Sequence, residues 1–290
     1  MKNIFTKLRQ SFSQGNLLTK LIYINVGVFF AVRLSIVFLT LFKVNGVDFL
    51  TYLQMPSLLK TLLYRPWTIL TYMFLHVDFL HIIFNMLWLY WFGKIFLQFF
   101  NERQLGGLYV SGGIAGALFF LLAYNLFPYF EGGYGLLMGA SASVMAIVFA
   151  VSFYQKNYEI NLMFVGRVKL IYLALFTLII DVLMIVSDNA GGHIAHLGGA
   201  LFGILFATQL QHGKDWTVYV NRLIDQVVNR GKRKPRMKVT YQKKETDMEY
   251  NARKRRNSEM LDAILDKLKH SGYESLSADE KRALFDASKK

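Results

Sequence analysis

The chain has no cysteine, which excludes disulfide bonds, catalytic thiols and thiolate metal sites. Acidic residues are also scarce: 19 Asp and Glu stand against 33 Lys and Arg, and 20 of these 33 lie in residues 211–290. The basic N-terminus has no small-residue cleavage site behind a short apolar core. We therefore predict a solvated basic C-terminal tail, and a first apolar segment that acts as its own insertion signal.

Long apolar runs make up most of the remaining sequence. Apolar residues account for 54% of the 290 residues, too many for an ordinary soluble domain. A helix that crosses a bilayer needs roughly 20 apolar residues. Six runs approach that length, at 21–42, 79–100, 105–127, 136–153, 168–186 and 194–210. The predicted fold is an all-α, polytopic membrane protein whose residues 17–211 form a six-helix bundle, with the fourth and the sixth helix short.

Positive charge in the connecting segments predicts the orientation of these helices. Lys and Arg precede the first run, flank the turn after the second, separate the fourth from the fifth and crowd the tail. Residues 128–134 and 187–192 contain neither. Both termini, including the segment 1–16, are therefore expected in the cytoplasm, and a bacterial inner membrane is the expected location. The second, fourth and sixth helices then all run inward from the outer face.

The connection at residues 43–65 is long and mixes leucines with polar residues. This pattern is typical of short helices in the membrane interface, although an irregular surface loop is the alternative. Pro66 and Trp67 follow, and Trp67 is expected to be an interfacial anchor.

The C-terminal tail is predicted to consist of a basic cytoplasmic linker, 212–256, and a small helical hairpin, 257–290. The linker carries basic clusters at 230–236 and 253–256, which favour the lipid of an anionic leaflet over nucleic acid as partner. Apolar residues return at helical spacing from Met260 to Leu268, and Ser277 and Glu280 have the spacing of a capping box.

Ser141, near the start of the fourth apolar run, is the candidate nucleophile. It follows Gly139 and a glycine-rich loop at 131–135 that can admit water and substrate. Ser143 is a second candidate, but Ser141 lies closer to the predicted helix start. Small residues also occur in membrane helices merely to let them pack, so this motif alone does not define a site.

A serine hydroxyl needs a neighbouring base, and His196 near the start of the last run is the candidate. Gly199 and Gly203 follow on its helix and would let that helix approach another one closely. If that other helix is the fourth, His196 comes within reach of Ser141. His193 is the alternative base, nearer the surface.

His81 and Asn85 lie four residues apart, and so on one face, in the first turns of the second helix. Attack on a peptide carbonyl creates an oxyanion, which such donors can stabilise together with a helix N-terminus. The predicted topology brings these two side chains, Ser141 and His196 to a similar depth below the outer surface. Polar groups inside membrane spans are rare and usually functional, so the four indicate one site.

These motifs resemble those of the rhomboid intramembrane serine proteases. The resemblance covers roughly residues 15–210 and rests on three motifs in order: His-x-x-x-Asn at 81–85, Gly-x-Ser-x at 139–142, and Ala-His-x-Gly-Gly at 195–199. It implies a serine–histidine dyad without an aspartate, with Ser141 as nucleophile and His196 as base. His81 and Asn85 would hold the oxyanion, and Gly139, Gly199 and Gly203 would support the site.

The resemblance also implies transmembrane protein substrates, cut near the outer end of a membrane helix, and no cofactor or metal. The sequence departs from the family at three positions: Ala142 replaces a glycine, Met145 an aromatic residue, and Thr68 an arginine.

Three other functions compete with this prediction. A metal site could use His76, His81, His193 and His196, but the sequence has no carboxylate motif among them. A non-catalytic rhomboid-like protein that binds and escorts membrane proteins would typically lack the serine or the histidine. A transporter would be expected to show internal repeats, and only Asp181 and Arg33 are candidate midplane charges.

Overall fold

The computed structural model describes residues 2–44, 46, 48–162, 166–229 and 246–288. It contains two compact units, Met1–Gly231 and Lys232–Lys290. The helices of the first unit are α1 (Lys2–Gln14), α2 (Leu17–Leu41), α3 (Leu59–Tyr64), α4 (Thr68–Thr71), α5 (Phe79–Phe99), α6 (Glu102–Leu126), α7 (Ser141–Tyr154), α8 (Leu170–Leu183), α9 (Ala190–Gln211) and α10 (Thr217–Asn229). Its 3-10 turns are η1 (Tyr72–Phe74) and η2 (Pro128–Phe130), and its strands are β1 (Met55–Pro56), β2 (Leu136–Leu137), β3 (Glu159–Leu162) and β4 (Gly166–Lys169).

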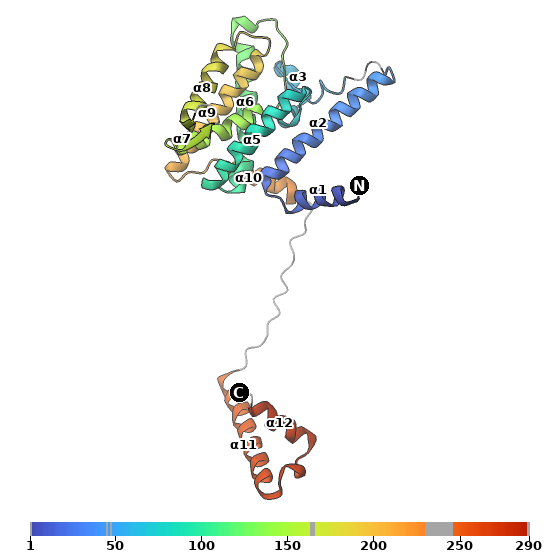
Figure 1. Cartoon of the computed structure of the whole chain (residues 1–290), viewed down its shortest axis with the longest axis vertical. Coiled ribbons are helices and arrows are strands. Elements are labelled where there is room, and N and C mark those ends of the chain that lie inside the picture. The colour runs from blue at the N-terminus through green and yellow to red at the C-terminus, as the bar shows by residue number, and fades with distance from the viewer. Residues whose placement is uncertain (1, 45, 47, 163–165, 230–245, 289–290) are drawn as a thin grey trace. The chain divides into compact units, whose positions relative to one another are not determined.

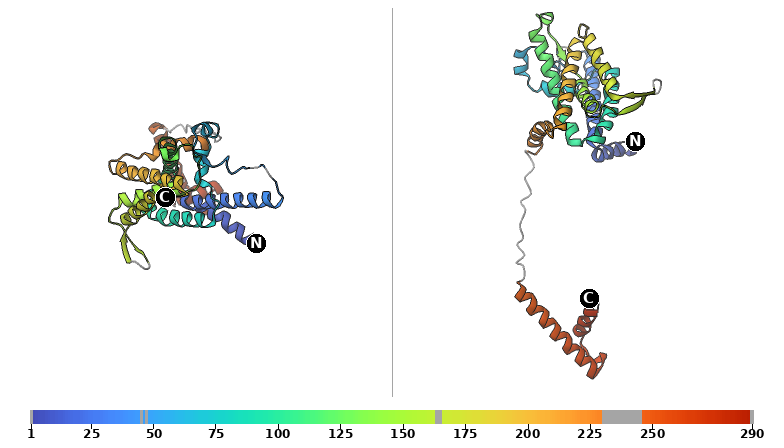
Figure 2. Two further views of the ribbon diagram at one scale, coloured as in Figure 1. Left: turned by 90° about the horizontal axis from the view of Figure 1, so that it is seen from above. Right: turned by 90° about the vertical axis from the view of Figure 1, so that its left-hand side faces the viewer.

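Four of these helices, α2, α5, α6 and α9, are long and apolar enough to cross a membrane. The remaining two apolar helices, α7 and α8, have 14 residues each. The sixth predicted helix is not short, because α9 extends over 22 residues. The fifth is shorter than predicted because residues 166–169 pair with 159–162 as an antiparallel hairpin, β3–β4, which projects from the bundle (Figure 2).

The core of the first unit surrounds α7, against which α5, α6, α8 and α9 pack. Every residue of α7 from Ala142 to Ser152 is buried. Small residues permit this packing: a Cβ on Gly112 of α6 would lie 2.3 Å from the Cβ of Ala146. A helix so enclosed by protein need not span the bilayer with its own length.

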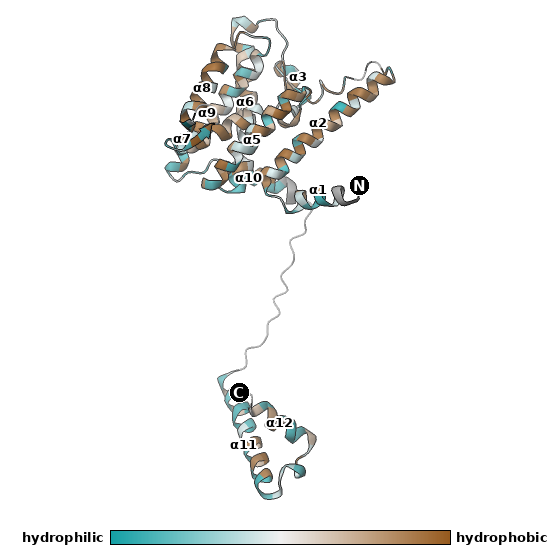
Figure 3. Ribbon diagram, in the orientation of Figure 1, coloured by the Kyte–Doolittle hydropathy of each residue, from teal (hydrophilic) through white to brown (hydrophobic). Residues whose placement is uncertain are grey.

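The helices around this core consist largely of apolar residues (Figure 3), and many of these side chains are exposed. Large side chains of α2, α5 and α8 point outward, among them Leu34, Phe84 and Phe176, whose exposed fractions are 65%, 59% and 60%. Helices with large apolar side chains on their outer faces suit a lipid environment, where their backbone hydrogen bonds are satisfied internally. The first unit is therefore a membrane domain.

The connection between α2 and α5 differs from the prediction of short interfacial helices. Within the predicted segment 43–65, the one helix among the described residues is α3 at 59–64, whereas residues 49–53 form turns. The side chain of Arg65 explains the compact turns, because it donates to the Thr51 carbonyl at 3.1 Å and lies over the Tyr52 ring. Trp67 donates to the Tyr52 carbonyl at 2.8 Å, so it anchors this connection to the protein.

The second unit contains α11 (Asp247–Ser271), the turn η3 (Tyr273–Ser275) and α12 (Ala278–Ser288). The predicted capping box is present, since Glu280 accepts from the Ser277 N–H at 2.7 Å and its own N–H donates to the Ser277 hydroxyl. Lys267 of α11 donates to Glu280, and Ile264 and Leu276 are buried between the segments.

The boundaries of the predicted linker differ from the structure. α11 begins at Asp247 and not at residue 257, because Thr246 and Glu249 form a second capping box. Within 212–229 the chain forms α10, whose Asn221 donates to the Arg103 carbonyl near the start of α6. The basic cluster 230–236 lies outside the described residues.

Candidate active site

Ser141 is the first residue of α7, and the backbone before it is held in place by the segment that precedes α5. The Gly139 N–H donates to the Tyr72 carbonyl at 2.9 Å, and the Ala140 N–H donates to His76 Nε2 at 3.3 Å. Gly139 has a φ of +122°, a conformation that side chains disfavour. A Cβ there would also lie 2.9 Å from His81 Cε1 and 3.7 Å from Ser141 Oγ. Glycine at 139 therefore lets the His81 ring approach the serine.

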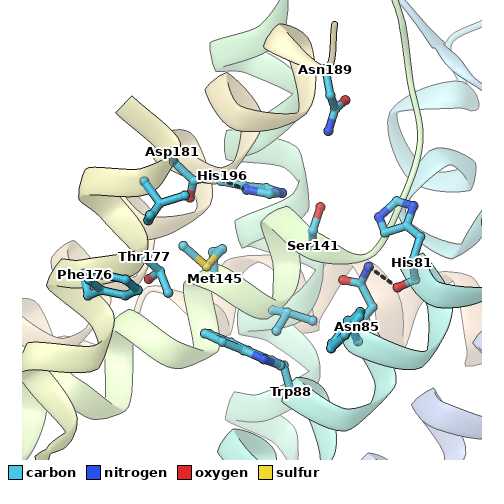
Figure 4. Close-up of a pocket in the computed structure, with 13 residues that line it drawn as sticks. His81, Asn85, Trp88, Ser141, Met145, Phe176, Thr177, Asp181, Asn189 and His196 are labelled. Carbon is cyan, nitrogen blue, oxygen red and sulfur yellow. Dashed lines mark hydrogen bonds and ion pairs between the residues drawn. The ribbon is translucent and has the colours of Figure 1, made fainter. Parts of the chain in front are cut away.

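His81 and Asn85 lie in the first two turns of α5. The Asp78 carboxylate caps this helix by accepting from the His81 N–H at 2.8 Å, and the Asn85 amide donates to the His81 carbonyl at 2.9 Å. Asn85 is buried, and its amide retains a second N–H. Both side chains lie on the same side of Ser141 and line the same cavity (Figure 4).

His196 lies in the second turn of α9, and its Nδ1 is 2.7 Å from Asp181 Oδ1 on α8. The same oxygen is 2.8 Å from Nδ1 of His193. The dyad implied by the family resemblance has no aspartate, so this contact is a departure. The contact forms because α8 packs on α9. The last turn of α8, which carries Asp181, lies next to the first turns of α9, which carry the two histidines.

One cavity of about 480 Å³ connects these groups. Ser141, His81, Asn85, His196 and Asp181 all line it, so side chains from α5, α7, α8 and α9 converge there (Figure 4). Apolar side chains form most of the other walls, namely Phe84, Trp88, Val144, Met145, Phe176 and Ile180, and the polar Thr177 and Asn189 complete the lining. Among the described residues, no hydrogen bond joins the Ser141 hydroxyl to His196, which is common in sites without substrate.

The approach of α9 to α7 depends on two glycines. A Cβ on Gly199 would lie 2.0 Å from the Ala142 carbonyl oxygen, and one on Gly203 would lie 2.3 Å from that of Ala146. Because these contacts are with backbone, no rotamer change can relieve them. The helix that carries His196 therefore packs directly on the helix that begins with Ser141.

The two alternative candidates from the sequence, Ser143 and His193, are not among the residues that line the cavity. Ser143 is fully buried, does not line the cavity, and its hydroxyl has no hydrogen-bond partner within the described structure. His193 does not line the cavity either, but it contacts Asp181. Of the two serines, only Ser141 is open to a ligand in this cavity.

A metal ion has one candidate set of ligands among the described residues, namely Asp181, His193 and His196. The carboxylate that the sequence motifs lacked is thus supplied by α8, while His76 and His81 are not members of the set. The ligand atoms lie only 2.7 and 2.8 Å apart in the two pairs, as in hydrogen bonds. Around a tetrahedral zinc ion with bonds of 2.0–2.1 Å, neighbouring ligands are about 3.3 Å apart. The observed spacing fits hydrogen bonding better.

Sequence reasoning missed the contacts of two residues at this site. Asp181 was weighed only as a transporter charge, yet a carboxylate near the end of an apolar helix was itself a signal of function. The sequence offers His76 as a candidate metal ligand, but the hydrogen bond that it accepts from the Ala140 N–H joins residues 64 positions apart.

The fold and the cavity together define a helical membrane protein with a serine and an imidazole at one internal site. The rhomboid domain family model matches residues 64–212, which includes all of these side chains. The chain belongs to the rhomboid family. A second model, a family of unknown function (DUF6576), matches residues 244–290, most of the second unit.

Curated relatives have rhomboid-like names. RHOMBOID-like protein 12, mitochondrial, of Arabidopsis thaliana is 29% identical over 218 residues, which are 71% of this chain and 61% of the plant protein. Presenilin-associated rhomboid-like protein, mitochondrial, is 31% identical in Homo sapiens and in Bos taurus, over 47% of this chain. The matches cover 35% and 36% of those two proteins. These relatives are named as mitochondrial, so they do not support the expected bacterial inner membrane.

Proposed function

We propose that this protein is an intramembrane serine endopeptidase that cleaves transmembrane segments of other membrane proteins. The observation that carries the proposal is the convergence of Ser141, His196, His81 and Asn85 on one cavity in a membrane domain. Three separate helices supply them, and each places its residue within its first two turns. Packing alone does not require four polar side chains at one level.

Ser141 is the proposed nucleophile and His196 the general base. In the first step Oγ bonds to the carbonyl carbon of the substrate peptide, and its proton passes to His196 Nε2. The carbon–nitrogen bond then breaks, and the leaving amine takes that proton. Water subsequently attacks the acyl-enzyme, with His196 again accepting and returning a proton.

His81 and Asn85 are the proposed oxyanion donors, together with the backbone N–H of Ser141. The His81 ring lies beside the serine, and the second N–H of Asn85 is available to a negative oxygen. The N-terminus of α7 adds its partial positive charge at the same place. Removal of one such donor typically reduces kcat by about 10²–10³.

The apolar walls of the cavity support a membrane-embedded substrate. Phe84 and Trp88 on α5 and Phe176 on α8 present aromatic surface beside the serine. An apolar segment that has unwound near the end of a membrane helix would find both apolar contacts and backbone hydrogen-bond partners there. The positions of Lys and Arg favour an arrangement with both termini on one side of the membrane, the side on which the Lys- and Arg-containing connections lie.

The test is a cleavage assay on a model single-span substrate, with the purified full chain in detergent or in lipid vesicles. Ser141→Ala and His196→Ala are expected to abolish the product, whereas Ser143→Ala and His193→Ala retain cleavage. A chelator is expected to leave the rate unchanged.

Cleavage that persists in Ser141→Ala would refute the proposal. So would an active wild-type protein that a chelator inactivates and zinc restores. Binding of the substrate by the wild type without any cleavage would instead support an escort function, the alternative weighed from the sequence.

A further inference from the structure

Asp181 is a carboxylate in an otherwise apolar helix. It lies in the last turn of α8, and its side chain is 7% exposed. Burying a carboxylate without partners is costly, and ionisable residues in membrane helices are rare. The groups that contact Asp181 therefore need an explanation, which the general family mechanism does not supply.

Both partners of Asp181 are imidazole nitrogens. Its Oδ1 accepts from Nδ1 of His196 at 2.7 Å and from Nδ1 of His193 at 2.8 Å. An ionised carboxylate can only accept hydrogen bonds, so each Nδ1 must carry a hydrogen. In a neutral His196 the lone pair is then on Nε2, the nitrogen on the far side of the ring.

The position of this far nitrogen matters because the ring of His196 points into the cavity that Ser141 lines (Figure 4). A base that takes the serine proton must present a lone pair there, and in the opposite tautomer it would present N–H. A carboxylate behind the ring fixes the required tautomer and stabilises the imidazolium that forms during reaction.

We propose that Asp181 is a positioning residue for His196, so that the proposed peptidase works with an Asp–His–Ser relay and not with a dyad alone. This proposal rests on the proposed function. His193 supports the relay from behind, because it donates to the same oxygen from one turn earlier on α9 and limits the rotation of the carboxylate.

Few other ionisable groups face His196. Among the described residues, α5 contributes His81, α9 contributes His193 and α8 contributes Asp181. The side chains that α7 adds to the cavity, Ser141, Val144 and Met145, carry no charge. Asp181 is thus the one acidic side chain among the described residues that line the cavity. Substitution of Asp181 should therefore produce a measurable change in how the reaction rate of Ser141 depends on pH.

The experiment measures the rate at which a fluorophosphonate probe labels the full chain, from pH 5 to 9. In this reaction a bond forms between Ser141 Oγ and phosphorus, fluoride leaves, and His196 takes the serine proton. Asp181→Asn is expected to slow labelling by about 10²-fold or more, the usual contribution of a general base. In a plot of labelling rate against pH, the fall at acid pH should occur at a lower pH in this variant than in the wild type, because the imidazolium has lost its stabilising charge.

Matched variants separate positioning from folding. Asp181→Glu keeps the charge, so this variant should label at an intermediate rate. Asp188 is an exposed carboxylate near the start of α9, and its variant Asp188→Asn should label like the wild type. His193→Ala should be slowed less than Asp181→Asn. The double variant should match Asp181→Asn alone, because His193 acts through the carboxylate.

A second readout does not need a reactive serine. ¹⁵N NMR of histidine-labelled protein, at a pH above the acid fall in labelling rate, should show His196 with hydrogen on Nδ1 in the wild type and a mixture of tautomers in Asp181→Asn. His196→Gln assigns the signal.

The outcomes are distinguishable. A wild type that does not label refutes the proposed function, and the NMR result then still decides the role of Asp181. Equal labelling rates and pH profiles for wild type and Asp181→Asn, or hydrogen on Nε2 in the wild type, would overturn the relay.

Discussion

Helices α7 and α8 have the same length, 14 residues, but opposite surroundings. In α7 all residues from Ala142 to Ser152 are buried, whereas α8 buries only Leu170, Ala174 and Asp181. The first helix is held by protein on all sides, and the second exposes a face suited to lipid. The candidate nucleophile thus begins the most enclosed helix, while the carboxylate behind its base comes from a peripheral one.

The largest expected effect on activity tests the close packing around α7. Gly199→Val places methyl groups where a Cβ alone would meet the Ala142 carbonyl at 2.0 Å, so α9 must move away. Overpacking typically costs about 1–3 kcal/mol and occasionally more, and we expect the upper end and a loss of cleavage. The measurement is thermal unfolding in detergent beside the cleavage assay.

The matched control is Gly27→Val on α2, where a Cβ would meet nothing within 4 Å. It should unfold like the wild type and keep its activity. If both variants behave alike, close approach of α9 to α7 is not what stabilises the site.

A pair of isoleucines compares α7 and α8 directly. Ile147 on α7 is fully buried and Ile179 on α8 is 57% exposed. Ile147→Ala should lower the free energy of unfolding by about 2–5 kcal/mol, because it leaves a cavity in an enclosed core. Ile179→Ala should change it by no more than about 0.5 kcal/mol. Similar losses for both would mean that α8 is covered by protein in the native assembly.

The smallest expected effect concerns Ser143. Its buried hydroxyl has no partner in the described structure, so Ser143→Ala removes a desolvated group without breaking a hydrogen bond. Unfolding should change by less than about 1 kcal/mol, and cleavage should continue. A complete loss of cleavage with unchanged stability would move the nucleophile from Ser141 to Ser143.

Much of this site could be predicted because its residues occupy corresponding places in separate helices. Ser141, His81 and His196 each follow a helix start, and alternating helix direction brings such positions to one level. The predicted oxyanion pair could be placed for the same reason, since residues four apart share a helix face.

What could not be predicted depends on contacts between distant segments. The shortening of α8 arises from the β3–β4 pairing, whose strands read as part of an apolar run. The pairing of Asp181 with two imidazoles depends on how α8 rotates about its axis. Hydropathy defines that rotation poorly in a helix that is apolar nearly all round.

The anchoring of residues 135–140 has a consequence for each encounter with a substrate. The Ser57 N–H donates to the Gly135 carbonyl, and the Gly135 N–H donates to the Ser57 hydroxyl. The Gly139 N–H donates to the Tyr72 carbonyl, and the Ala140 N–H donates to His76. Fixing the backbone of one residue costs roughly 1–2 kcal/mol of conformational entropy. Here that loss occurs once, when the chain folds, so an arriving peptide meets a hydroxyl already in place and must order only itself.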